Sequence, residues 1–149
     1  MKIDNRVAYT LMELLLVLAI LSIISLLTIP NTKFFLNMRE QQELNELKKD
    51  LLYARNRAIV EGRSYFVYFD RERNQYIIRY SETSPPVKVK EFKHGIKIWK
   101  DNSTSILRFN ANGRPGESGS IYLVDRKNNR YKLSLTPATG RIELGILDK

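Results

Sequence analysis

Cysteine is absent from the 149-residue sequence, and histidine occurs once, as His94. The first absence excludes a disulfide framework, a thiol nucleophile and a zinc site with cysteine ligands. The second leaves His94 without another imidazole for a transition metal, and we expect it to be a surface residue. Residues 112–116 lack the Gly-Lys-Ser/Thr ending of a phosphate-binding loop, and no nucleophile-elbow pattern occurs. We therefore expect a protein that is not an enzyme and uses no cofactor or metal ion.

Charged side chains are nearly missing from residues 9–29, where Glu13 is the single one. A helix over this stretch would rise about 31 Å, which matches the roughly 30 Å hydrocarbon thickness of a bilayer. No small-x-small cleavage site follows the stretch, as a secretory signal peptide would require. Lys2 and Arg6 precede it and favour a cytoplasmic N-terminus. The pattern predicts a membrane-spanning helix, with the remaining chain outside the cytoplasm.

Glu13 is the unusual residue of this stretch. A carboxylate costs about 2.5–3.5 kcal/mol near the centre of a membrane helix, and less near the interface. One interpretation places Glu13 at the headgroup boundary, where the cost is small. The other is that Glu13 meets a cation when subunits pack together. The residues themselves leave both open.

The segment around Glu13 resembles the N-terminal signature of type IV pilins. That signature is a small residue, usually Gly, then Phe-Thr-Leu-x-Glu and an apolar helix. The matching residues here are Ala8-Tyr9-Thr10-Leu11-Met12-Glu13, followed by Leu14-Leu15-Leu16-Val17-Leu18-Ala19-Ile20. Ala8 replaces the family's Gly and Tyr9 its Phe. The resemblance implies cleavage by prepilin peptidase between Ala8 and Tyr9, with N-methylation of Tyr9. Pro30 falls where many family members carry a helix-bending proline.

The same resemblance implies a mode of assembly. Cleavage would create an α-amino group four residues before Glu13, and Glu13 of one subunit could pair with the Tyr9 amine of its neighbour. Such a pair would relieve a buried charge and set a register that contacts between leucines lack. The implied partners are prepilin peptidase, other pilins or pseudopilins and the assembly platform. The implied location is the bacterial cytoplasmic (inner) membrane as a single-pass protein, and an extracytoplasmic filament after assembly.

A second, amphipathic helix is predicted after Pro30, where a kink is expected. Apolar residues recur there at helical spacing: Leu44, Leu47, Leu51, Ala54 and Ala58. Charged residues lie between them and are expected on the wet face: Glu40, Glu43, Lys48, Lys49 and Arg55. Gly62 is a natural stop. The predicted organisation is a leader at residues 1–8, a transmembrane and filament-core helix at 9–30, an amphipathic continuation at 31–62 and a β-rich globular head at 63–149.

The head is predicted to consist of antiparallel strands. Apolar alternation predicts them at residues 64–69, 76–80, 87–90, 95–100, 105–110, 121–124, 131–135 and 142–146. Residues 70–75 and Asn128-Asn129 should form the turns of two hairpins. A long helix followed by runs of strands is an α+β architecture, here a long N-terminal transmembrane-plus-amphipathic helix packed on antiparallel β-sheet, as in pilins.

The body of the chain resembles a subgroup of the pilin-like family, the H-type (GspH/FimT-like) minor pseudopilins. The stretches that carry this are residues 51–59, the aromatic strand ending in Phe69-Asp70, and Thr139-Gly140-Arg141-Ile142. The subgroup implies a low-copy subunit that helps to initiate or cap a type IV pilus or a type II secretion pseudopilus.

A DNA-binding minor pilin for natural transformation, in a competence pilus, is the alternative. The net charge is +9, and basic residues gather in two segments: Lys88, Lys90, Lys93, Lys97 and Lys100, and then Arg126, Lys127, Arg130 and Lys132. Such patches can hold phosphates, but lysines also solvate strand faces and protect edges. Some DNA-binding relatives carry Gly-Arg-x-Arg near the C-terminus. Here Arg141 provides the first Arg and Glu143 stands in place of the second, which disfavours nucleic acid as a partner.

Overall fold

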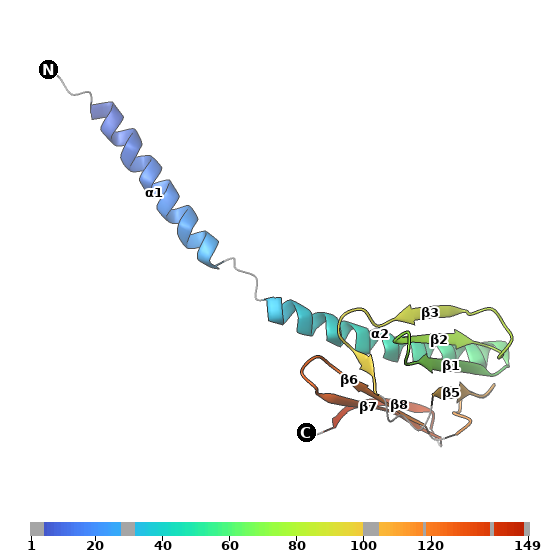
Figure 1. Ribbon diagram of the computed structural model, residues 1–149. Coiled ribbons are helices and arrows are strands. Elements are labelled where there is room, and N and C mark those ends of the chain that lie inside the picture. Colours follow the sequence, from blue (N-terminus) through green and yellow to red (C-terminus); the bar gives the residue numbers. More distant parts are fainter. Residues whose placement is uncertain (1–4, 28–31, 100–104, 118, 138, 148–149) are drawn as a thin grey trace. The chain divides into compact units, whose positions relative to one another are not determined.

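The computed structural model describes residues 5–27, 32–99, 105–117, 119–137 and 139–147 (Figure 1). The chain divides into two compact units, Met1–Phe35 and Leu36–Lys149. The described residues hold two helices followed by eight strands.

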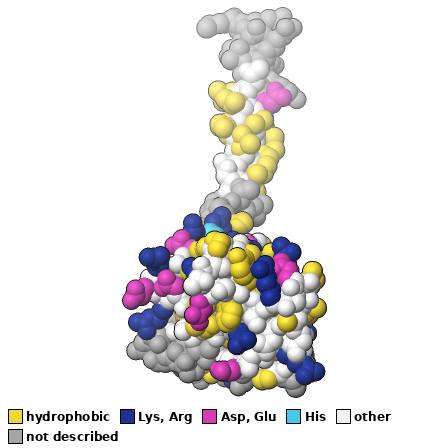
Figure 2. All heavy atoms as spheres, turned by 90° about the vertical axis from the view of Figure 1, so that its right-hand side faces the viewer, with side chains coloured by type: hydrophobic (Ala, Val, Ile, Leu, Met, Phe, Trp, Pro, Cys, Tyr) yellow, Lys and Arg dark blue, Asp and Glu magenta, His cyan; other side chains and the backbone are white. Residues whose placement is uncertain are grey.

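Helix α1 (Asn5–Leu27) lies in the first unit. Side chains are described for residues 10–25, and all of them are exposed (Figure 2). Two hydroxyls are satisfied inside the helix, because Ser22 Oγ donates to the Leu18 carbonyl at 2.7 Å and Ser25 Oγ to the Leu21 carbonyl at 2.8 Å. The exposed surface of residues 10–25 is therefore almost entirely apolar.

Within the part of the chain that the structure describes, no helix combines the length and apolarity needed to cross a membrane. The span predicted from the sequence runs to residue 30, and residues 28–31 lie outside the described residues. The membrane span and the kink at Pro30 stay predictions.

Helix α2 (Thr32–Glu61) contains the apolar stripe expected from the sequence. Its five members are all buried: Leu44, Leu47, Leu51, Ala54 and Ala58. The predicted stop is also confirmed, because Gly62 has a φ of 62°. The Arg63 N–H donates to the Ala58 carbonyl at 3.2 Å and the Gly62 N–H to the Ile59 carbonyl at 3.4 Å. This is a Schellman cap, in which a residue without a Cβ takes the left-handed conformation that ends the helix.

Two four-stranded antiparallel sheets follow (Figure 1). Sheet A has the order β3-β2-β1-β5, formed by β3 (Lys88–Glu91), β2 (Gln75–Arg79), β1 (Tyr65–Asp70) and β5 (Ile106–Phe109). Sheet B has the order β4-β6-β7-β8, formed by β4 (Lys97–Ile98), β6 (Ser120–Val124), β7 (Arg130–Thr136) and β8 (Arg141–Leu147). The predicted α+β class, with an amphipathic helix against antiparallel strands, is confirmed.

One hydrophobic core joins α2 to both sheets. Strand side chains alternate between the core and the outer face, as in β1, where Tyr65, Val67 and Phe69 are buried. In β7 the same alternation buries Tyr131, Leu133 and Leu135. Each sheet therefore has an outer face that does not contribute to this core.

Both predicted hairpins are present, and their turns contain the two non-glycine residues of positive φ in the described chain. Asn74 has a φ of 49° and Asn128 a φ of 64°. Asparagine tolerates this conformation because its short polar side chain bonds nearby backbone. The Asn74 side chain accepts from the Ile98 N–H at 3.1 Å and donates to the Ile96 carbonyl at 2.8 Å, so this turn also anchors the segment before β4.

The prediction that a strand begins at residue 95 is wrong. Only Lys97–Ile98 pair as β4. Gly95 has a φ of 118°, outside the range of a strand, and the Ile96 carbonyl is taken by Asn74 rather than by a neighbouring strand. A side chain from a distant hairpin turn therefore competes with the sheet for this segment.

Candidate functional site

Helix α1 carries three of the four residues that sequence analysis assigned to processing and assembly. Ala8 and Tyr9 lie within it, although their side chains are not among those described, and Glu13 is exposed. The large apolar side chains beside Glu13 are 46–72% exposed: Leu11, Met12, Leu14, Leu15, Leu16, Val17, Leu18, Ile20, Leu21, Ile23 and Ile24. Pro30 lies outside the described residues. Among residues 10–25, Glu13 is the single charge on an otherwise apolar rod.

The acidic residues of α2 correct the sequence analysis. Glu40 and Glu43 were expected on the wet face, but they are only 3% and 5% exposed, and Asp50 is 7% exposed. The three carboxylates lie at the helical spacing of the buried stripe, so they share its face. A buried carboxylate needs donors, and each of the three receives hydrogen bonds from the β-rich part of the unit.

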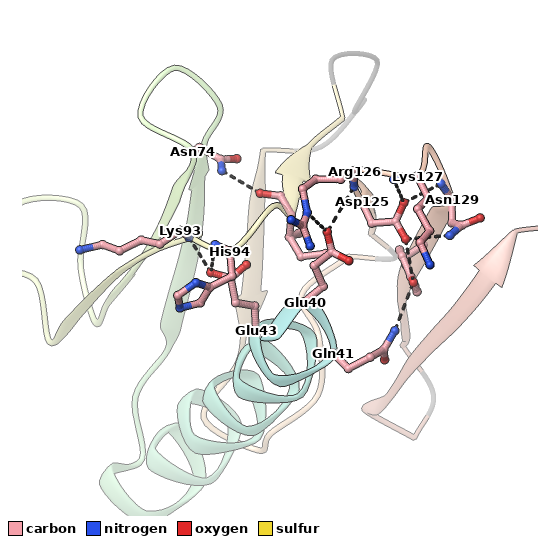
Figure 3. Close-up of polar contacts among 12 residues, drawn as sticks. Glu40, Gln41, Glu43, Asn74, Lys93, His94, Asp125, Arg126, Lys127 and Asn129 are labelled. Atoms are coloured by element: carbon pink, nitrogen blue, oxygen red, sulfur yellow. Dashed lines mark hydrogen bonds and ion pairs between the residues drawn. The ribbon is translucent and has the colours of Figure 1, made fainter. Parts of the chain in front are cut away.

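The Glu43 side chain holds the segment between β3 and β4 by accepting hydrogen bonds from the backbone of that segment. Its Oε1 accepts the N–H groups of Lys93 at 2.5 Å and His94 at 2.9 Å (Figure 3). Its Oε2 is buried without a hydrogen-bond partner among the described residues. The imidazole of His94 is exposed, as expected for a surface histidine.

Glu40 binds Arg126 of the β6–β7 turn. Arg126 Nε donates to Glu40 Oε1 at 2.5 Å, and the Arg126 N–H donates to the same oxygen at 3.4 Å (Figure 3). The hydrogen bond that Arg126 donates to Glu40 raises the pKa of Arg126. Gly95 lies against the pair, and a Cβ there would be 2.6 Å from both Glu40 Oε1 and Arg126 Nε. Arg126 is therefore ion-paired with a buried carboxylate, while its own side chain stays 39% exposed.

Asp50 joins α2 to sheet A. It accepts from Tyr76 Oη at 2.6 Å and from Lys88 Nζ at 2.6 Å. Burial, together with the hydrogen bond to Asp50, raises the pKa of Tyr76. Further along α2, Arg55 donates to the carbonyls of Gly113 at 3.1 Å and Thr139 at 3.3 Å.

These four polar side chains of α2 therefore each reach a different place in the β-rich part of the unit. Sequence reasoning missed Glu40, Glu43 and Asp50 in this role. The signal that could have found them is their spacing of three and seven residues, in phase with Leu47 and Ala54.

The outer face of sheet B gathers three of the five residues considered for nucleic acid. Lys132 pairs with Tyr122 across the β6–β7 ladder, and Arg130 lies two residues before it on the same face. The Arg130 guanidinium is 4.7 Å from the centre of the Trp99 ring, and Lys132 Nζ is 6.0 Å from that of Tyr122. Arg141 shares this face, because it pairs with Thr136.

Many of the basic side chains are neutralised by carboxylates. Arg141 Nε is 3.0 Å from Glu143 Oε1, and Lys90 Nζ is 2.8 Å from Glu46 Oε2. Figure 2 shows one face of the unit, where Lys and Arg side chains are interspersed with Asp and Glu. Across the described residues, no carboxylate forms an ion pair with Lys127, Arg130 or Lys132. Nor do the described residues contain a group of three or more histidine and acidic side chains that could hold a metal ion.

Comparison with known proteins agrees with this architecture. The family described as type II transport protein GspH matches residues 43–139. Two crystal forms of the Pseudomonas aeruginosa type IV minor pilin FimU are similar in fold, at 20% and 22% identity with TM-scores of 0.58 and 0.60. They cover 70% and 74% of this chain and 91% and 92% of FimU.

The minor pseudopilin EpsH of the type 2 secretion system of Vibrio cholerae is also similar, at 11% identity and a TM-score of 0.54, over 71% of this chain and 95% of EpsH. A search among curated proteins finds no match.

Proposed function

The chain belongs to the GspH family of type II transport proteins, and on this premise we propose that it is a minor pilin or pseudopilin, a subunit of a type IV pilus or a type II secretion pseudopilus. Its globular unit has the fold of FimU, a type IV minor pilin, and of EpsH, a type 2 secretion pseudopilin. In this role the protein works by assembly with other pilins and performs no catalysis.

The observation that carries the proposal is the apolar surface of α1. Eleven large apolar side chains of residues 11–24 are about half exposed or more. Exposed apolar surface costs about 25 cal/mol per Å² relative to buried surface, so this helix requires an apolar surrounding. Lipid before assembly and the helices of neighbouring subunits after assembly both provide one. The chain would be a single-pass protein of the cytoplasmic membrane, with the globular unit outside the cytoplasm.

Glu13 places one charge on this apolar surface, and that charge can fix how neighbouring subunits pack. In an apolar surrounding its carboxylate needs a positive partner, and the α-amino group of a processed Tyr9 on a neighbouring subunit can provide it. Processing by prepilin peptidase between Ala8 and Tyr9, followed by N-methylation, would create that group. The residues of the pilin-like signature support this step.

Processing can be tested by co-expression of the full chain with a prepilin peptidase. Mass spectrometry should show the loss of residues 1–8 and a new N-terminus at Tyr9. Ala8→Trp should block cleavage, because the site requires a small residue, whereas Ala8→Gly should be cleaved at least as well as the wild type. An intact Met1 terminus in the wild type, or cleavage after Ile29, would contradict the assignment.

A DNA-binding minor pilin for natural transformation is the second candidate function. The observation that favours it is the outer face of sheet B, where Arg130 and Lys132 lie over the aromatic rings of Trp99 and Tyr122. Cations beside aromatic rings are suited to phosphates and unstacked bases. The candidate ranks second because Arg126 and Arg141, two of its expected contacts, form ion pairs with Glu40 and Glu143.

A further inference from the structure

Strand β8 is the open edge of sheet B, and its backbone polarity can be worked out. The Leu135 N–H of β7 donates to the Gly119 carbonyl, on the β6 side. Backbone groups alternate along a strand, so Ser134 and Lys132 of β7 point toward β8. Their partners are Glu143 and Gly145. The N–H and C=O groups between those partners, including those of Leu144, therefore point away from the sheet.

Three β8 residues present this outward backbone: Ile142, Leu144 and Ile146. No further strand flanks β8 in the described sheet. The side chains of the same residues change from buried Ile142 through half-buried Leu144 to Ile146, which is 69% exposed. The core of the unit is thus open along this edge.

The other sheet edges are shorter or covered. Strand β4 has two paired residues, and β3 has four. Strand β5 is covered by its own loop, because the Gly116 N–H donates to the Arg108 carbonyl at 2.9 Å and Phe109 forms a bridge with Pro115. Strand β8 has seven residues and no such cover among the described residues. Long uncovered edges are sites for the addition of another strand.

A groove of about 460 Å³ runs along β8, and its charge favours one kind of occupant. Lys48 of α2 and Lys132 of β7 line it beside Leu144 and Ile146. No ion pair is formed by either lysine in the described chain, whereas the groove's acid, Glu143, is paired with Arg141. A strand that fits has apolar side chains at alternate positions and a carboxylate near Lys48 or Lys132. A second copy of this chain fits less well, because it would bring the same lysines together.

We propose that β8 receives an extended, apolar and acidic segment of a neighbouring pilin-type subunit, which continues sheet B as a fifth strand. This inference rests on the proposed function, since it assumes that the neighbours are other pilins. It adds an attachment point on the globular unit that is separate from α1. Recognition would combine main-chain hydrogen bonds to Leu144 and Ile146 with apolar contacts to their side chains.

Ile146→Pro tests the backbone edge directly. Proline removes an N–H that the sheet does not use, and edge strands tolerate it. Gly145 precedes it within β8, so it already has the extended conformation required before proline, and it has no Cβ that could clash with the ring. Ile146→Thr is the matched control, because it keeps the N–H and the β-branch while removing apolar surface.

The full chain, co-produced with the other pilin-type subunits of its host, is isolated from membranes, and the amount of pilin-type subunit bound per chain is measured. Ile146→Thr should retain binding within about twofold, and Ile146→Pro should lose about tenfold, because a strand hydrogen bond is lost and the ring obstructs the edge. Resistance to proteolysis checks that both variants are folded. In the wild-type complex, hydrogen exchange at the Leu144 and Ile146 amides should slow by about tenfold or more.

Equal losses in the two variants would overturn the proposal in favour of side-chain docking. Unchanged binding in both would exclude β8 as an interface, and amide protection produced by self-association would replace the neighbouring subunit by a second copy. These outcomes differ from failure of the proposed function, in which the wild-type chain itself binds no pilin-type subunit.

Discussion

Glu43 shows how a single carboxylate can organise a distant loop. Its Oε1 accepts two consecutive backbone N–H groups, from Lys93 and His94, about fifty positions along the chain. Buried N–H groups that lose their acceptor cost about 1–3 kcal/mol. The residue is therefore a structural anchor, and its importance can be measured.

Glu43→Ala should lower the free energy of unfolding by about 2–3 kcal/mol, because two amides lose their acceptor. Glu46→Ala is the matched control, since Glu46 is half exposed and its ion-pair partner among the described residues is Lys90, at the surface. It should cost less than about 1 kcal/mol. Urea denaturation of both variants measures the difference. Similar losses in the two would show that the amide contacts of Glu43 contribute little.

A second prediction concerns glycine. Gly95→Ala should destabilise the fold by about 1–3 kcal/mol, because the residue has a φ of 118° and a Cβ would lie 2.6 Å from Glu40 Oε1. Gly145→Ala should change stability by less than about 1 kcal/mol, since nothing lies within 4 Å of the new Cβ and φ is not positive. Comparison of the two urea midpoints tests the close approach at Gly95. A neutral Gly95→Ala would show that the segment can move away.

At the scale of the element, α1 and α2 differ in what covers them. Helix α2 buries its apolar stripe within its own unit, whereas the described part of α1 exposes its apolar side chains. The function of α1 therefore depends on partners outside the chain, and Glu13 is the residue through which those partners can be tested.

Glu13→Ala should still enter the membrane, and more easily, because a charge is removed from an apolar helix. It should enter filaments at least about tenfold less efficiently, since the Tyr9 amine of the neighbour is left unpaired and a lost partner of this kind costs about 3 kcal/mol or more. Glu13→Asp keeps the charge and should be less impaired. Immunoblotting of membrane and filament fractions measures both steps. Normal incorporation of Glu13→Ala would refute the proposed ion pair.

Secondary structure was largely predictable from the sequence, and the polar anchors were not. The stripe of α2, the Gly62 cap and the Asn128 turn follow from local periodicity and turn chemistry, so all three were found. The spacing of Glu40 and Glu43 could have indicated burial, but their charge favoured solvent, and no local pattern identifies the distant backbone groups that donate to them. The short β4 has the same cause, since Asn74 reaches it from another hairpin.

The basic residues of the β6–β7 hairpin were also predicted only in part: their clustering follows from the sequence, but their individual places do not. Arg126, Arg130 and Lys132 are close in sequence, but Arg126 is ion-paired with Glu40 of α2 while the other two share the outer face of sheet B. Proximity along a hairpin could not distinguish a residue of the turn, which meets α2, from residues of the strand, which alternate between faces.

At the scale of the whole molecule, the distribution of charge bears on the choice between the two candidate functions. The net charge of +9 alone would favour an anionic partner. Ion pairs reduce the number of cations that are available to an anionic partner. Each of four basic residues has a carboxylate partner: Lys88, Lys90, Arg126 and Arg141. The uncompensated cations on sheet B and its turn are few, so binding to DNA should be weak.

A fragment of residues 36–149 is suited to the measurement, because these residues form a compact unit. It should bind duplex DNA more weakly than about 10⁻⁶ M at physiological salt, and engagement of three cations would give a slope of log K against log salt of about −3. Replacing Arg130 and Lys132 by alanine should reduce this binding more than replacing the ion-paired Lys88 and Lys90. Gel-shift titrations at two salt concentrations measure both. Tight binding that depends on Arg130 and Lys132 would make DNA uptake the leading function.

The polar contacts along α2 also have a mechanical consequence. Glu40 and Arg55 are separated by about 22 Å of helix, and the contacts of Glu43 and Asp50 lie between them. A force along the axis of α2 would load all of these contacts at once, together with the apolar packing. No single contact would therefore carry the force before the others. The unit would therefore resist extension through several contacts that bear the load in parallel, and it would yield only when several of them broke together.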